Sequence, residues 1–187
     1  MRREEQIEAL ERAGIGVVLG DLVAMPIEDL REAMIGCDAI VFAAGAGGQD
    51  GAAATTAIDG QGPGKVATAA ALAGVSRFIL VSVFPEAGRE GRWGMPFEHY
   101  VAEKKNADVD IAARDLDWVI LRPSSLLDGP GTGRVSLGFA EIHGEIPRED
   151  VAATIVALLD EPRVNRTILE LTGGARPIGE AVAALMR

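Results

Sequence analysis

"AIVFAAG" at residues 39–45 decides the fold, because it is a continuous apolar run between Asp38 and a terminal glycine. A run without alternating polar residues is typical of a strand that is buried on both faces, as in a parallel sheet. Two more such runs follow, RFILVSV at 77–83 and DWVILRP at 117–123. We therefore expect these three segments to lie side by side as parallel strands in the interior of one sheet.

Amphipathic or alanine-rich segments separate the strands along the chain. We expect helices at residues 3–13, 26–36, 65–74, 97–114, 148–161 and 178–186, and further strands at 17–20, 135–139 and 166–174. The Gly-rich segment 45–64 is expected to form a loop. Strands that alternate with helices predict an α/β fold, a doubly wound parallel sheet with both faces covered. The whole chain, 1–187, is expected to form a single domain.

The amino-acid composition argues against several classes of function. The chain has 187 residues and a net charge of −10, which argues against binding to nucleic acid or to an anionic membrane. No apolar run approaches the ~18 residues of a membrane span. The single cysteine excludes an internal disulfide and fits a reducing, cytoplasmic location. Two histidines without a cysteine cluster argue against a metal site, so none is expected.

Three side chains suggest acid–base chemistry near the expected strand ends. Tyr100 and Lys104 are four residues apart, so they share one face of the expected helix. A lysine ammonium beside a phenol stabilises the phenolate and is expected to lower the pKa of Tyr100. Ser82 follows a buried strand, and its hydroxyl could hold a substrate carbonyl. Together Ser82, Tyr100 and Lys104 are candidate catalytic residues for hydride transfer.

The chain resembles the atypical short-chain dehydrogenase/reductases, an NAD(P)H-binding group related to NmrA-like and biliverdin-reductase-B-like proteins. The resemblance covers nearly the whole chain in family order. The segments that carry it are VVLGDL (17–22), CDAIVFAAGAG (37–47), AALAGVSRFILVSV (70–83), HYVAEKKNAD (99–108), LDWVILRPSSLLDGPGTGRV (116–135), IPREDVAATIVALLDEP (146–162) and ILELTGG (168–174). It implies a Rossmann-like fold and NADP or NAD as cofactor.

The resemblance also implies cofactor-binding roles for residues at the carboxyl ends of the strands. These are Asp21 and Leu22 beside the adenine, Ala43, Ala44 and Gly45 against the ribose, Ser82 and Lys104 at the nicotinamide ribose, Pro123 and Ser124 beside the nicotinamide, and Arg2 at the 2′-phosphate of NADP. Plainer alternatives stay open, since Asp21 could only cap a turn and Arg2 could only be a solvated terminal residue. Ser124 stands where the family usually has glycine.

The N-terminus departs from the family pattern, which begins with a strand, a G-x-x-G-x-x-G turn and a helix. No such unit precedes Met1, so we expect an N-terminally truncated domain whose binding of NADP or NAD is weak or absent. Exposed sheet edges would follow, and they could be relieved by an upstream segment, by pairing of 17–20 with 39–45, or by a homodimer.

We expect an NAD(P)H-dependent oxidoreductase that acts on an unidentified small carbonyl or flavin-like substrate. Two alternatives remain: a non-catalytic module that senses NAD(P) or binds a partner, and a truncated relict without cofactor binding. A substrate that depends on Tyr100 for its turnover would distinguish the first possibility from the others.

Overall fold

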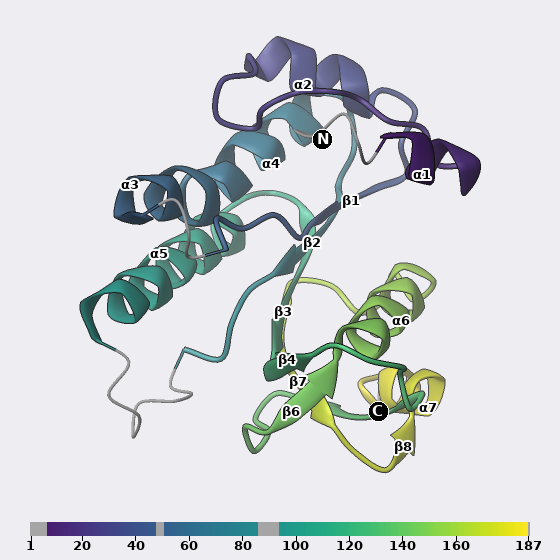
Figure 1. The fold of residues 1–187 in the computed structure, drawn as a ribbon. Coiled ribbons are helices and arrows are strands. Elements are labelled where there is room, and N and C mark those ends of the chain that lie inside the picture. The colour runs from purple at the N-terminus through teal and green to yellow at the C-terminus, as the bar shows by residue number, and fades with distance from the viewer. Residues whose placement is uncertain (1–6, 48–50, 86–93, 187) are drawn as a thin grey trace.

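The computed structural model describes residues 7–47, 51–85 and 94–186, and its centre is a six-stranded sheet (Figure 1). The strand order is β1-β2-β3-β7-β5-β8, with β1 to β3 and β7 parallel to one another. The strands of this sheet are β1 (Ala39–Phe42), β2 (Arg77–Val81), β3 (Asp117–Pro123), β5 (Arg134–Gly138), β7 (Thr167–Gly173) and β8 (Arg176–Pro177). A separate parallel pair joins β4 (Ser125–Leu127) to β6 (Glu145–Pro147).

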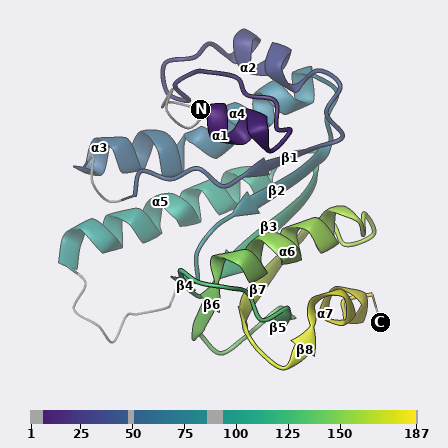
Figure 2. The same ribbon diagram turned by 45° about the vertical axis from the view of Figure 1, so that its right-hand side comes forward.

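Helices cover both faces of the sheet, which confirms the α/β, Rossmann-like expectation. In Figures 1 and 2, α2, α4 and α5 lie on one side of the strands, whereas α6 and α7 lie on the other. The helices are α1 (Ile7–Arg12), α2 (Ile27–Met34), α3 (Gly51–Thr55), the π-helical turn η2 (Thr56–Gly60), α4 (Gly62–Leu72), α5 (Gly94–Ala112), α6 (Arg148–Leu159) and α7 (Ile178–Ala184). No described helix is long and apolar enough to cross a membrane.

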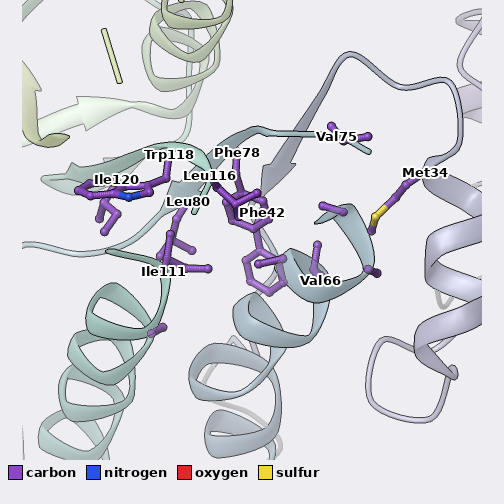
Figure 3. Packing of buried hydrophobic residues seen from close by; sticks show 14 residues of the cluster. Met34, Phe42, Val66, Val75, Phe78, Leu80, Ile111, Leu116, Trp118 and Ile120 are labelled. Carbon is purple, nitrogen blue, oxygen red and sulfur yellow. The ribbon is translucent and has the colours of Figure 1, made fainter. Parts of the chain in front are cut away.

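The two layers of the core follow from the alternation of side chains along the central strands. In β2, Phe78 and Leu80 face one layer, and Ile79 between them faces the other; all three are fully buried. Figure 3 shows the first layer, where Phe78 and Leu80 pack with Trp118 of β3. Because successive residues at the centres of these strands are buried in one layer or the other, positions 78–80 and 118–121 have to be apolar.

Three expectations about the sheet were wrong. The sheet is not wholly parallel, because β5 runs antiparallel to both β7 and β8. Residues 17–20 form no strand, so they do not pair with β1, and Val18 and Leu19 are about half exposed. β1 is also not buried on both faces, since Val41 is 39% exposed and no strand is described on its outer edge. Hydrogen bonding along the outer edge of β1 would need a further strand there, and the described residues supply none.

A buried carboxylate fixes the start of α6 against the turn 129–133. Asp150, 2% exposed, accepts hydrogen bonds from the Thr132 amide (2.9 Å), the Thr132 hydroxyl (2.9 Å) and the Gly133 amide (2.8 Å). Burial alone would raise the pKa of Asp150, but these donors outweigh it and hold the pKa below its usual value. The folded state therefore prefers the ionised carboxylate more strongly than the unfolded chain does.

Replacing Asp150 with asparagine should lower the free energy of unfolding by about 2 kcal/mol at neutral pH, because hydrogen bonds to a charged acceptor are lost. The folded pKa is depressed, so this contribution is present above the unfolded pKa and is lost as the pH falls below about 4. Urea unfolding followed by circular dichroism at neutral and acidic pH measures the difference. Asp38→Asn, a change of equal charge at an exposed site, is the control. A constant difference between Asp150→Asn and the parent down to low pH would contradict this account.

Candidate functional site

A cavity lies at the carboxyl ends of β1, β2 and β3, the edge where ligands bind in open α/β sheets. We call it the strand-end cavity. Its large lobe has a volume of about 1050 Å³ and its small lobe about 380 Å³. The large lobe is lined by Ala43, Ala44, Gly45, Gly47, Gly51, Ala52, Thr55, Asp59, Val81, Ser82, Met95, Pro96, Phe97, His99, Tyr100, Lys104, Pro123, Leu126 and Arg148. The cavity therefore gathers segments that are far apart in the sequence.

A helical segment that was expected to be a loop supplies one wall of the large lobe. The chain is helical from Gly51, and the alanine-rich stretch that follows explains why, since alanine has the highest helix propensity. The turn η2 interrupts the α-helical pattern between α3 and α4. Asp59 lies in this turn, is 1% exposed, and accepts a hydrogen bond from the Ala46 amide at 3.0 Å. The π-helical turn thus brings a carboxylate to the loop that follows β1.

Helix α5 presents Tyr100, Lys104 and Asp108 on one face, because each is four residues from the next. The Lys104 Nζ lies 3.3 Å from Asp59 Oδ1 and donates a hydrogen bond to the Val81 carbonyl at 3.2 Å. Both side chains of this ion pair are almost completely buried, at 5% and 2% exposure. Lys104 also lies 5.9 Å from the centre of the Tyr100 ring. The predicted pair of Tyr100 and Lys104 therefore does meet at the cavity, with Asp59 as a third member.

The pKa of Tyr100 moves in the direction opposite to the one expected from the sequence. Burial, and secondarily the negative charge of Asp59, raise this pKa to about 12. The expectation that Lys104 would lower it was wrong, because the Lys104 ammonium is paired with Asp59. The phenol is therefore a proton donor at neutral pH rather than a phenolate.

Ser82 lies in the cavity wall beside a buried ion pair beneath the site. It follows β2 and is 5% exposed, and its hydroxyl lies close enough to Asp108 to influence that carboxyl. Arg122 donates to Asp108 Oδ2 from Nε at 3.0 Å and from a terminal nitrogen at 2.8 Å. Burial raises the pKa of Asp108, while Ser82 and Arg122 oppose that shift. The ion pair of Arg122 and Asp108 thus places charged groups beneath Ser82.

The structure brings some of the other predicted residues to the cavity and not others. The residues Ala43, Ala44, Gly45 and Pro123 line the large lobe. Ser124 lines only the small lobe, and its hydroxyl accepts a hydrogen bond from the Gly144 amide at 3.2 Å.

Asp21 and Leu22 do not line the strand-end cavity. The Asp21 carboxylate caps its own turn by accepting the Val23 amide (2.8 Å) and the Ala24 amide (3.1 Å). Leu22 packs against the core layer of α2 and α4. Arg2 lies outside the described residues, so its role stays a prediction.

Sequence reasoning missed a second polar cluster, of which His99 lines the large lobe. The Thr56 hydroxyl donates to Glu103 Oε1 at 2.8 Å and lies 2.9 Å from His99 Nε2. Since the hydroxyl proton goes to Glu103, the His99 Nε2 must carry the hydrogen of that second contact. The one signal in the sequence was the spacing of His99 and Glu103, four apart on α5. No group of three or more metal-ligating side chains occurs in the described ranges 7–47, 51–85 and 94–186.

Comparison with known proteins places the chain in a family. A family model described as NAD(P)H-binding matches residues 1–162. The chain belongs to this NAD(P)H-binding family. Among curated relatives, the uncharacterized sugar epimerase YhfK of Bacillus subtilis (strain 168) is 42% identical over 185 residues, which are 99% of this chain and 86% of that protein.

Solved structures similar to the chain share its fold. A putative NAD-dependent epimerase/dehydratase from Bacillus halodurans is 34% identical, with a TM-score of 0.85 over 98% of this chain and 85% of that one. ChuY, an anaerobillin reductase from Escherichia coli O157:H7, is 27% identical, with a TM-score of 0.76 over 92% and 82%. Because the family match begins at residue 1, the comparisons give no support to the expected N-terminal truncation.

Replacing Asp59 with asparagine should lower the pKa of Tyr100 by about 1 unit or more, since a negative charge disappears and the Lys104 ammonium is no longer neutralised. Tyr100 is the single tyrosine of the chain, so the phenolate absorbance reports on it alone. An alkaline titration of folded protein, checked by circular dichroism, gives the midpoint. Asp110→Asn, on the same helix in an exposed ion pair with Arg114, should leave the midpoint unchanged. An equal midpoint in Asp59→Asn and the parent would overturn the assignment.

Proposed function

We propose that the protein is an NAD(P)H-dependent oxidoreductase that reduces a small carbonyl or flavin-like substrate. One observation carries the proposal: Tyr100 and the buried Lys104–Asp59 pair stand together on the wall of the strand-end cavity. In a chain of the NAD(P)H-binding family, a protonated phenol at this place is the group needed to complete a reduction.

The described residues fit the nicotinamide–ribose half of the cofactor. Backbone from Ala43 to Gly45 lines the large lobe, and Pro123 closes it at the end of β3. Lys104 has a buried ammonium that can donate to ribose hydroxyls while Asp59 holds it in place. When bound, the nicotinamide would supply a hydride to the substrate.

Each catalytic candidate would then have a separate task. Tyr100, which is protonated at neutral pH, would give its proton to the oxygen that gains charge as the substrate is reduced. The Ser82 hydroxyl, which lines both lobes as Tyr100 does, would donate a hydrogen bond to the same oxygen. Lys104 would set the position of the ribose and so the distance between nicotinamide and substrate.

The names of the relatives distinguish two kinds of nicotinamide chemistry. The two Bacillus proteins bear epimerase names, while the E. coli protein is called a reductase. A reductase consumes NADPH or NADH in proportion to product, whereas an epimerase leaves the oxidation state of its cofactor unchanged after each turnover. Tyr100 is protonated at neutral pH, as the proton donor of a reduction must be.

Tyr100→Phe should reduce the rate of carbonyl-dependent NADPH oxidation by about 10²- to 10⁴-fold, because the proton donor is removed. The affinity for NADPH, measured by calorimetry on the same variant, should change little, since the phenylalanine ring keeps the cavity wall. Calorimetry with NADPH and NADH on the parent gives the reference for both cofactors.

Lys65→Met is the control, because Lys65 donates to the Leu22 and Val23 carbonyls and does not line the large or small lobe. Unchanged turnover in Tyr100→Phe would contradict the proposal. Binding of NADPH without any turnover that depends on Tyr100 would instead favour the non-catalytic NAD(P)-sensing module.

A further inference from the structure

The two lobes of the strand-end cavity meet at the candidate acid. Six residues line both lobes: Ser82, Phe97, Tyr100, Pro123, Leu126 and Arg148. An occupant of the small lobe therefore lies against Tyr100 and Ser82 without filling the part of the large lobe near Asp59. The small lobe adds its own lining from Val83, Ser124, Ser125 and His143.

Arg148 is the side chain of the first turn of α6 that faces this junction. Its two acidic neighbours are held elsewhere, since Glu149 accepts the Gly131 amide at 2.6 Å and Asp150 is bound by the turn 129–133. Neither Glu149 nor Asp150 lines either lobe. The fold thus separates one cation from the two anions beside it in the sequence and leaves it at the cavity.

The charge of the cavity differs from that of the whole chain. The chain has a net charge of −10, but in the described lining the carboxylate of Asp59 is already neutralised by Lys104. Among the described residues, Arg148 is bound through Nε to Asp128, at 2.8 Å, and the Asp128 side chain is 91% exposed. An exposed pair of this kind is weak and screened by solvent. Its guanidinium therefore keeps donors for an anion inside the cavity.

The side chains around Arg148 are mostly apolar and suit a ligand with an apolar surface. Leu126 is 40% exposed and lines both lobes, as do the Pro123 and Phe97 side chains. In the small lobe, the His143 ring packs edge-on against Phe84, with 5.3 Å between the ring centres. Exposed apolar side chains next to a single cation favour a ligand that is apolar over most of its surface and negative at one end.

We propose that the small lobe binds the substrate and that this substrate is an apolar molecule with a carboxylate, which Arg148 anchors. The inference rests on the proposed function for the assignment of the large lobe to the nicotinamide–ribose half. Arg148 is then a specificity-determining residue: the carboxylate is held at the junction, and the reducible group lies against Tyr100 and Ser82. An Arg–carboxylate contact can use two donors, which fixes direction as well as position.

The test compares two probes of equal shape, 2-naphthoate and the neutral 2-naphthamide, by calorimetry on the full chain without cofactor. We expect the parent to bind 2-naphthoate about tenfold more tightly or better, as a charge-assisted hydrogen bond predicts. Arg148→Met should abolish this preference and keep the weaker affinity for 2-naphthamide. Arg163→Met is the matched control, because it removes the same charge from an exposed pair with Glu161, outside both lobes.

Three results would overturn the proposal. The first is a parent that binds both probes equally or neither, and the second is an Arg148→Met variant that keeps the preference while its circular dichroism is that of the parent. The third is displacement of 2-naphthoate by saturating NADPH, which would assign the anion site to the nucleotide. Because the first two measurements use no cofactor and no turnover, an absence of oxidoreductase activity would not affect them.

Discussion

The buried ion pair between Asp59 and Lys104 is the interaction on which the rest of the site depends. Taking two charges out of water costs several kcal/mol each, so the pair persists only because further hydrogen bonds complete it. The Ala46 amide binds Asp59, and the Val81 carbonyl accepts from Lys104. The pair therefore connects the loop after β1, the end of β2 and the face of α5. A shift of any one of these segments would leave a charge unpaired in the interior.

The Asp59–Lys104 pair also affects the protonation state of Tyr100, the candidate proton donor of the site. A free ammonium beside a phenol would favour the phenolate, but an ammonium that faces a carboxylate presents little net charge to its neighbour. Burial then dominates and keeps the Tyr100 hydroxyl protonated. The same two residue types, tyrosine and lysine one helical turn apart, can thus serve opposite directions of proton transfer. Here burial first, and the charge of Asp59 second, keep the phenol protonated.

Sequence reasoning was accurate where a local pattern is tied to burial. The central positions of the runs that became β2 and β3, 78–80 and 118–121, had to be apolar, because successive side chains enter two different core layers. The spacing of Tyr100 and Lys104 was sufficient to place them on one face of a helix. Local patterns could not reveal Asp59, because its partner Lys104 is distant in the chain and only the folded topology brings them together. The glycines at 45–51 also concealed the helix that follows, since alanines decide its conformation once Gly51 has begun it.

Because the turn η2 interrupts the helical segment 51–72, the first part of the segment lines the cavity and the second part packs in the core. Before it, Gly51, Ala52 and Thr55 line the cavity; after it, Val66 and Ala70 of α4 pack in the core layer. A π-helical turn contains one residue more than an α-helical turn, so it changes the angular phase between the two halves. Removing a single residue there would rotate the cavity wall relative to the core by roughly 100°. The length of this turn therefore matters apart from its side chains: we expect an insertion or deletion within 56–60 to misalign the cavity wall even where it leaves Asp59 in place.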